Sequence, residues 1–296
     1  MIFVEIIKAV LFGIVEGITE WLPVSSTGHL ILLEELLPLN IAPELGAAFA
    51  EEYFSMFEVV IQLGAILAVV VMFFGKLNPF ALSKSKAEKR STWVLWAKVL
   101  IASVPAAFIG IVLDKLIEKM SGKDIDGWIY NWQTVATALI IYGVLFIVIE
   151  RLHKNKQSRV NTTDDISFSQ AAVIGCFQAL SIVPGTSRSG STILGSRCIG
   201  ISRSAAAEFS FFMGIPAMAG ASLIKGYSFI DHVLETDVTV PASAWLMLAL
   251  SSAVAFAVSM AAIKFLMDFV KKHSFAPFGV YRIILGVLVI AYFVMR

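Results

Sequence analysis

The sequence predicts an all-α polytopic membrane protein. Of its 296 residues, 58% are hydrophobic and only 15% are charged, which is more apolar surface than a water-soluble domain of this size carries. Its apolar runs reach the ~20 residues that a helix needs to cross the hydrocarbon, whereas the strands of a membrane barrel alternate over ~10 residues. The formal net charge of +1 gives no support to nucleic-acid binding, which requires a basic face.

Six apolar stretches have the length of a full membrane crossing. They are residues 54–74, 93–113, 132–150, 205–224, 242–267 and 276–295. The whole chain, 1–296, is therefore expected to form a single integral membrane domain.

Two further stretches, 3–37 and 168–201, are apolar but are interrupted midway by Pro, Gly and Ser. A broken helix is tolerated at membrane depth only where protein or a cavity surrounds the irregular backbone. We therefore expect two re-entrant helical hairpins in addition to the six spans.

Basic residues gather in three connections between the predicted spans. These are Lys76, Lys84, Lys86, Lys89 and Arg90 in 75–91, Arg151, Lys154, Lys156 and Arg159 in 151–159, and Lys271 and Lys272 after the fifth span. Because basic loops remain in the cytoplasm, both termini are expected outside. The first hairpin then enters from the outer face and the second from the inner face.

The two halves of the chain resemble each other weakly. Residues 13–19 (GIVEGIT) resemble 175–181 (GCFQALS), and each segment precedes a break rich in Pro and Ser. With the hairpins entering from opposite faces, this pattern predicts an inverted-topology repeat, with one copy in about 1–150 and the other in about 165–296. Broken helices at corresponding positions of such repeats indicate a shared site near the middle of the membrane.

The first hairpin carries an acidic cluster. Glu16 and Glu20 are four residues apart and therefore lie on one helical face, where two carboxylates require a divalent cation or a nearby Arg. The alternative is that each carboxylate only hydrogen-bonds nearby backbone or lies at the lipid boundary. Glu58 and Gln62, also four residues apart, either line the same site or bridge two helices.

The break after Pro23 adds hydroxyl groups, a glycine and an imidazole: Ser25, Ser26, Thr27, Gly28 and His29. A hydroxyl beside a carboxylate and an imidazole supplies the groups for nucleophilic displacement or acid–base catalysis. The alternatives are an ordinary helix-capping turn and a structural, hydrogen-bonded histidine.

The second hairpin carries a segment suited to binding an anion. It comprises Gly185, Ser187, Arg188, Ser189, Gly190, Ser191 and Thr192. Arg binds phosphate in a bidentate manner, and a helix that starts in this segment would direct backbone N–H groups at the anion. The alternative is that Arg188 pairs with a glutamate purely for packing.

At these residues the chain resembles the undecaprenyl-diphosphatase family, membrane phosphatases that are also linked to bacitracin resistance. Residues 16–29 (EGITEWLPVSSTGH) fit the Glu-rich first motif of that family, and 184–192 (PGTSRSGST) fit its Pro-Gly-x-Ser-Arg-Ser-x-x-Thr motif. The resemblance extends over nearly the whole chain. It implies removal of the terminal phosphate from undecaprenyl diphosphate, a divalent cation such as Mg²⁺ or Ca²⁺, and a site in the plasma (inner) membrane that opens to the outer face.

The resemblance and the residue chemistry together suggest roles for the candidate residues. The catalytic candidates are Glu20, Ser26, His29 and Arg188, and the metal candidates are Glu16 and Glu20. The substrate-binding candidates are Ser25, Thr27, Gly28, Gly185, Ser187, Ser189 and Thr192. Ser26, His29 and water each remain possible as the nucleophile.

The expected partners are a polyprenyl diphosphate lipid and the bilayer, with a homodimer as a further possibility. Bacitracin would compete indirectly by binding the substrate. The alternative function is an inverted-repeat transporter or flippase for lipid phosphates or anions, because broken helices that meet at the membrane centre are also a transporter design.

Overall fold

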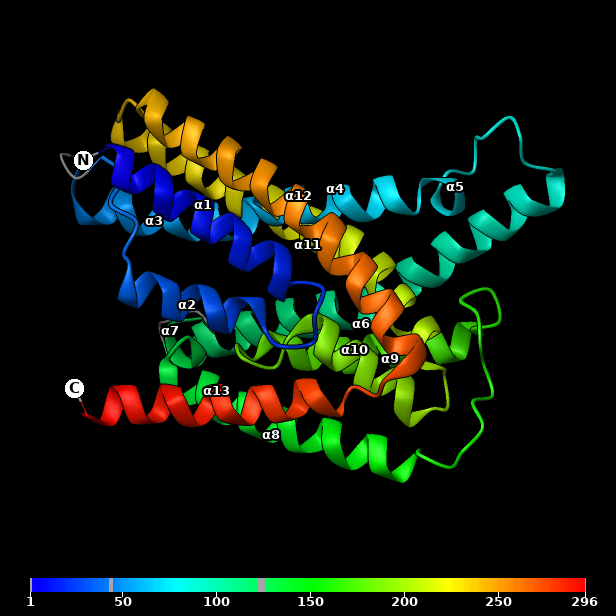
Figure 1. Ribbon diagram of the computed structural model, residues 1–296. Coiled ribbons are helices and arrows are strands. Elements are labelled where there is room, and N and C mark those ends of the chain that lie inside the picture. The colour runs from blue at the N-terminus through cyan, green and yellow to red at the C-terminus, as the bar shows by residue number, and fades with distance from the viewer. Residues whose placement is uncertain (1, 43–44, 122–125, 296) are drawn as a thin grey trace.

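The computed structural model describes residues 2–42, 45–121 and 126–295, and these ranges are mostly helical (Figure 1). Six helical segments within them are long and apolar enough to cross a membrane: Gly46–Met72, Lys86–Ile117, Trp132–Leu152, Arg203–Thr236, Ala242–Lys272 and Ala276–Met295. Each overlaps one of the six stretches expected from the sequence. The prediction of an all-helical, multi-pass membrane protein is therefore confirmed.

The helix bounds show how the chain is divided. The long helices are α6 (Lys86–Ser121), α8 (Trp132–Leu152), α11 (Arg203–Thr236), α12 (Ala242–Lys272) and α13 (Ala276–Met295), and the first span is divided into α3 (Gly46–Val60) and α4 (Gln62–Met72). The shorter elements are α1 (Ile2–Thr19), α2 (Ser26–Leu36), α5 (Phe74–Leu77), α7 (Asp126–Ile129), α9 (Phe168–Ala179), the 3₁₀ turn η2 (Leu180–Ile182) and α10 (Arg188–Cys198).

The two interrupted stretches each form a pair of short helices joined by an irregular turn. In Figure 1, α1 runs inward from the end of the molecule that holds both chain termini, and α2 returns to that end. The pair α9 and α10 belongs to the opposite end, where α10 is tied to the end of α8 by a hydrogen bond from Arg197 to Glu150. The two turns therefore meet inside the molecule.

The two turns share one local geometry, and each follows a proline, which has no N–H to donate to the preceding turn of a helix. Pro23 and Pro184 are each followed, two or three residues later, by a serine with a positive φ: Ser25 at 78° and Ser187 at 71°. The side chain of each serine caps the next helix by accepting a hydrogen bond from the backbone N–H of the residue three positions on. The first helical residues after the breaks are Ser26 and Arg188.

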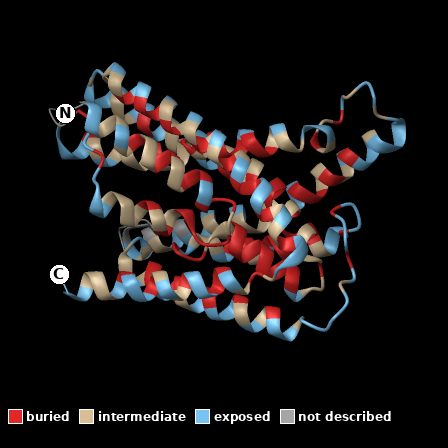
Figure 2. Ribbon diagram, in the orientation of Figure 1, coloured by how far each residue is buried: buried red, intermediate tan, exposed pale blue. Residues whose placement is uncertain are grey.

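Close helix contacts hold the turns in place. Helix α1 packs on α12, α9 on α6, and α13 on α8. At Gly13 an added Cβ would lie 2.5 Å from the carbonyl oxygen of Ser251 on α12, so the small residue lets the two backbones touch. The buried residues are concentrated around the meeting point of the turns (Figure 2).

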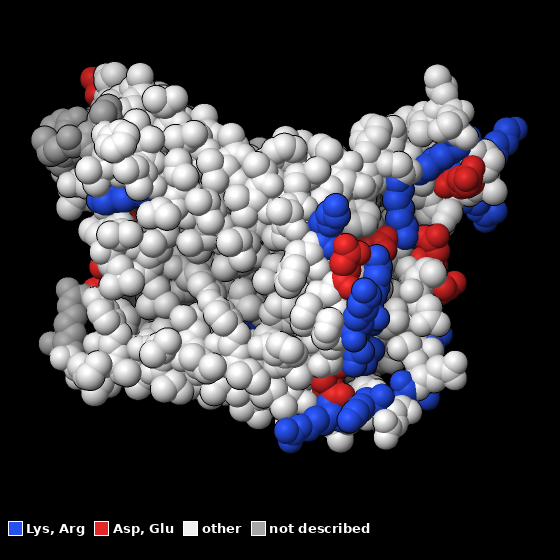
Figure 3. Space-filling model, in the orientation of Figure 1, with Lys and Arg blue, Asp and Glu red and all other residues white. Residues whose placement is uncertain are grey.

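Basic residues are concentrated at one end of the long axis of the molecule. On the face drawn in Figure 3, lysines and arginines gather at the end opposite the two termini, together with several carboxylates. The connections 75–91 and 151–159 and the end of α12 lie at this end in Figure 1. The three basic segments thus share one end, as the orientation argument requires.

Candidate functional site

An ion pair joins the two turns at the centre of the molecule. Arg188, the first residue of α10, donates from Nη2 to Oε1 of Glu20 over 3.0 Å, and the two side chains are 11% and 7% exposed. The same guanidinium donates from Nη1 to the backbone oxygen of Ser210 on α11 over 2.6 Å. The charged fork of Arg188 is therefore held in one orientation by two elements.

The second oxygen of Glu20 holds a serine hydroxyl. Ser26 donates from Oγ to Oε2 of Glu20 over 2.6 Å, a distance typical of a hydroxyl bonded to an ionised carboxylate. Glu20 thus contacts Arg188 with one oxygen and Ser26 with the other. This arrangement can orient the hydroxyl and receive its proton.

The hydroxyls expected to bind substrate mostly fix the turn itself. Ser189 donates to the backbone oxygen of Glu20 over 3.1 Å, and the hydroxyls of Thr192 and Ser210 lie 2.7 Å apart. Ser187 caps α10 and lies 3.1 Å from the Ser189 hydroxyl. These side chains position the segment around Arg188 by holding it against α1 and α11.

Both ring nitrogens of His29 contact groups other than the Ser26 hydroxyl. Its Nε2 lies 2.7 Å from the hydroxyl of Tyr281 on α13, and its Nδ1 lies 2.6 Å from the backbone oxygen of Ser25. Because a carbonyl oxygen only accepts, Nδ1 carries the proton, and in the neutral ring Nε2 accepts from Tyr281. The two rings are also stacked. Sequence reasoning did not identify Tyr281, which no motif marks.

Arg282 is a second site residue that sequence reasoning missed. It is 0% exposed on α13 and donates from Nη1 to the backbone oxygen of Pro23 over 3.1 Å. Its Nη2 donates to the backbone oxygens of Gly185 and Thr186 over 2.6 and 3.0 Å. One guanidinium therefore ties the two turns together. The signal was available, because Arg282 is the lone charged residue in the apolar stretch 276–295 and such residues are rarely incidental.

Glu16 is fully buried on α1, and no group in the described part of the chain hydrogen-bonds either of its carboxylate oxygens. The charged groups that act on it are Glu20, Glu58 and Arg188. An unpaired buried carboxylate is costly, so Glu16 is suited to bind a cation or a proton.

The described side chains around Glu16 do not by themselves make up a metal site. No set of three His, Cys, Asp or Glu side chains among the described residues is arranged to hold an ion. Mg²⁺ commonly binds through one or two carboxylates while substrate phosphate and water complete its shell. Glu16 and Glu20 therefore fit such an ion together with a phosphate ligand.

A cavity of about 950 Å³ extends from the first turn toward the end of the molecule that holds the termini, and Glu16, Glu20, Ser26 and Arg188 are not among its lining residues. Thr27 lines it near the first turn, and Glu34 and Glu51 line it toward that end. Glu58 and Gln62 both line the cavity, and Glu58 accepts a hydrogen bond from Tyr130.

The fold and this centre define a class: a multi-pass helical membrane protein with a buried arginine–carboxylate–serine cluster beside a polar cavity. The chain belongs to the bacitracin resistance protein BacA family, whose sequence model matches residues 9–288. It is 50% identical to the undecaprenyl-diphosphatase of Limosilactobacillus fermentum over 98% of both chains. It is 47% identical to that of Enterococcus faecalis over 99% of both chains, and 50% identical to that of Streptococcus mutans over 100% of this chain and 99% of the relative. The family resemblance seen in the two motifs is confirmed.

Proposed function

We propose that this protein hydrolyses undecaprenyl diphosphate to undecaprenyl phosphate and inorganic phosphate, which recycles the lipid carrier for cell-wall synthesis. Membership of the BacA family and similarity to undecaprenyl-diphosphatases over the full chain support this activity. The structural observation that carries it is the chain of contacts from Arg188 through Glu20 to Ser26. Increased turnover of the diphosphate would lower the amount that bacitracin can bind, which explains resistance.

The reaction uses the hydroxyl of Ser26 as the nucleophile. Its Oγ attacks the terminal phosphorus, its proton passes to Glu20, and the bond from that phosphorus to the bridging oxygen breaks, so that undecaprenyl phosphate leaves. Water then attacks the phosphoserine, Glu20 returns its proton to the departing serine oxygen, and inorganic phosphate leaves with the protons of the water, which restores the hydroxyl. Arg188 binds the phosphoryl oxygens and stabilises their charge in the transition state.

The position of His29 suits a supporting role in this reaction. Its two ring nitrogens are hydrogen-bonded to Tyr281 and to the backbone oxygen of Ser25. The imidazole can therefore pass a proton to the leaving oxygen only after one of these hydrogen bonds breaks. Glu20 is already bonded to Ser26 and is the better placed proton acceptor.

A divalent cation such as Mg²⁺ or Ca²⁺ is expected at Glu16 and Glu20. The two unpaired oxygens of the buried Glu16 carboxylate support this assignment. When bound, the ion would neutralise phosphate charge and hold the diphosphate in place. Glu16 supplies a carboxylate that no group of the described residues hydrogen-bonds, while Glu20 also contacts Ser26 and Arg188.

The lipid tail of the substrate is expected to leave the site beside α8. A groove of about 470 Å³ lies there, lined by Gln133, Thr134, Thr137, Ala138, Ile141, Tyr142, Leu180, Val183 and Thr186. Thr186 belongs to the turn that Arg282 holds. The groove would thus let an apolar tail lie against the outside of the bundle while its diphosphate reaches the centre.

The membrane arrangement follows the charge pattern. The basic end would lie in the cytoplasm, so the large cavity would open to the outer face of the plasma membrane. The pairs α1–α2 and α9–α10 would be re-entrant hairpins of an inverted repeat, with copies in 1–150 and 165–296. The matching geometry at Ser25 and Ser187 supports this repeat.

Phosphate release by the purified protein in detergent tests the activity. We expect Mg²⁺-dependent release of inorganic phosphate from undecaprenyl diphosphate, and loss of release in Arg188→Ala. Transport requires two compartments and hydrolysis does not. Absence of release in detergent, together with movement of a lipid phosphate across a vesicle membrane, would overturn hydrolysis in favour of a flippase.

A further inference from the structure

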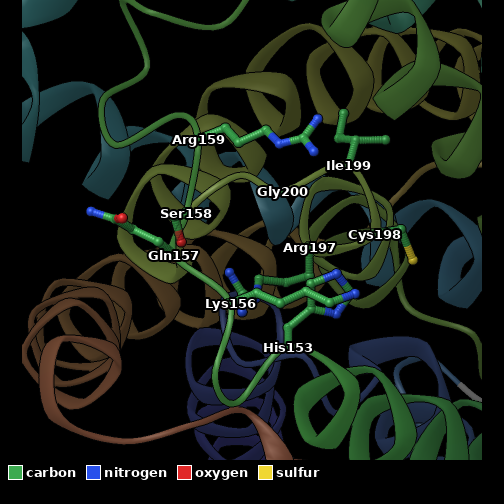
Figure 4. Close-up of a pocket in the computed structure, with 9 residues that line it drawn as sticks. All are labelled: His153, Lys156, Gln157, Ser158, Arg159, Arg197, Cys198, Ile199 and Gly200. Carbon is green, nitrogen blue, oxygen red and sulfur yellow. The ribbon is translucent and has the colours of Figure 1, made fainter.

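A basic pocket lies at the basic end of the molecule, at the end of α10 opposite Arg188 (Figure 4). It has a volume of about 220 Å³ and is lined by His153, Lys156, Gln157, Ser158, Arg159, Arg197, Cys198, Ile199 and Gly200. These nine residues include three cations, one histidine and no carboxylate. The hydrolysis mechanism uses none of them.

Backbone hydrogen bonds fix the two chain segments that line this pocket. The N–H of Arg159 donates to the oxygen of Gly200 over 2.9 Å, and the N–H of Ser202 donates to the oxygen of Val160 over 2.8 Å. A parallel bridge between Val160 and Ile201 joins the same two segments. The connection after α8 is therefore pinned to the turn between α10 and α11, and the pocket lies between them.

The base of the pocket holds a buried guanidinium. Arg197 is 5% exposed and donates from Nε to Glu150 over 3.2 Å and from Nη1 to the backbone oxygen of Ile201 over 2.6 Å. Arg has five N–H donors, so Nη2 still has donors to offer. Glu150 is shared with Arg203, which donates to it from Nε over 2.9 Å, so one carboxylate faces two guanidinium groups.

The cations surround the space from more than one side. In Figure 4, His153, Lys156 and Arg197 gather on one side of the pocket, and Arg159 extends along the other. A volume of 220 Å³ is smaller than the ~300–1,000 Å³ of clefts that bind drug-sized ligands. Convergent Lys and Arg donors in a small space are the usual setting for a phosphate group.

We propose that this pocket binds a phosphate group, supplied either by free inorganic phosphate or by the headgroup of an anionic lipid. Arg197 forms the base of the site and the exposed side chains of Lys156 and Arg159 close over the anion. Helix α10 begins at Arg188 and ends at Cys198, so a ligand here contacts the same helix whose first residue serves the catalytic centre.

Cys198 provides a reporter inside the pocket, and Cys176 provides a matched reporter outside it. These are the two cysteines of the sequence, and both are exposed. The rate of N-ethylmaleimide labelling of Cys198 is measured in the full-length Cys176→Ser protein with increasing inorganic phosphate in detergent. A second arm uses nanodiscs of phosphatidylcholine with or without phosphatidylglycerol. Cys176 is followed in the same way in the Cys198→Ser protein.

We expect a ligand to slow Cys198 labelling about 5-fold or more while leaving Cys176 unchanged. Protection by inorganic phosphate identifies a free-phosphate site, and protection only with phosphatidylglycerol identifies a headgroup site. Lys156→Gln combined with Arg159→Gln should abolish protection. Lys86→Gln combined with Arg90→Gln, which removes the same charge from exposed positions at that end, should preserve it.

Two outcomes overturn the proposal. One is unchanged Cys198 labelling in both arms. The other is protection that persists in the Lys156→Gln, Arg159→Gln protein, because that protection would arise outside the pocket. The four substituted side chains are all exposed or at the rim, so each variant is expected to fold, and retained phosphate release from undecaprenyl diphosphate confirms that it has.

Discussion

Ser26 and Glu20 lie at opposite ends of the turn between α1 and α2, yet the hydroxyl of Ser26 donates to the carboxylate of Glu20 over 2.6 Å. Arg188 occupies the other oxygen of that carboxylate. The Glu20 side chain therefore positions both the Ser26 hydroxyl and the Arg188 guanidinium that the proposed reaction requires. Its effect depends on the turn at Pro23, which brings the end of α1 back beside the start of α2.

Ser26→Ala is expected to reduce phosphate release by on the order of 10³-fold or more, because it removes the attacking oxygen. Release of inorganic phosphate from undecaprenyl diphosphate in detergent measures the effect. Ser55→Ala, which changes a serine on the wall of the neighbouring cavity, should retain activity. Near-normal release by Ser26→Ala would instead indicate that water is the nucleophile.

Arg188→Lys is expected to lower kcat by about 10²–10³-fold, as for loss of other charge-stabilising donors. A lysine is a single point charge and cannot contact Glu20 and the Ser210 carbonyl with separate branches of a fork. The exposed Arg151 at the basic end provides the control, since Arg151→Lys should leave kcat unchanged. Equal kcat values for the two variants would show that Arg188 acts only in packing.

Arg282→Met is expected to lower both the melting temperature and the activity. It leaves the carbonyls of Pro23, Gly185 and Thr186 without their donor, and each buried unsatisfied group costs about 1–3 kcal/mol. Thermal unfolding in detergent and phosphate release measure the two effects, and the exposed Arg90→Met serves as the control. A variant with unchanged melting temperature and full activity would contradict the assignment of Arg282 as the residue that ties the turns.

Tyr281→Phe is expected to reduce kcat about 10-fold if His29 contributes to proton transfer. The substitution keeps the stacked ring but removes the hydroxyl 2.7 Å from Nε2. The melting temperature should not change, and Tyr227→Phe, at an exposed tyrosine, should leave both quantities intact. Full activity in both Tyr281→Phe and His29→Ala would remove the imidazole from the mechanism.

Glu16→Gln is expected to raise the Mg²⁺ concentration needed for half-maximal activity by at least ~10-fold, the lower end of the range for outer-shell substitutions at metal sites. The neutral amide fills the same space and carries no charge to attract the ion. A Mg²⁺ titration of phosphate release measures the shift. Glu51→Gln, near the outer part of the cavity, is the control, and an unchanged Mg²⁺ requirement in Glu16→Gln would exclude Glu16 as a ligand.

The sequence predicted the elements well because the membrane imposes a simple rule on them. A stretch such as 276–295 must be a helix of about one membrane thickness, since its backbone has no water to bond. Its lone Arg282 was visible in the same stretch but was not singled out. The bounds differed most for the second and fourth spans, because α6 (Lys86–Ser121) and α11 (Arg203–Thr236) extend well beyond the expected 93–113 and 205–224. The first span begins earlier than expected, at Gly46, and is broken at Ile61.

The sequence by itself determined the family, the six apolar spans and the two polar motifs, because these depend on composition and on the local order of residues. Only the tertiary structure decided which groups meet. Glu20 and Arg188 are 168 positions apart, and their contact depends on helix packing that places two turns at one point. The pairing of His29 with Tyr281, 252 positions away, was decided in the same way. The partners of a side-chain hydrogen bond are the groups that the fold brings within hydrogen-bond distance. Local sequence does not specify which distant groups these are.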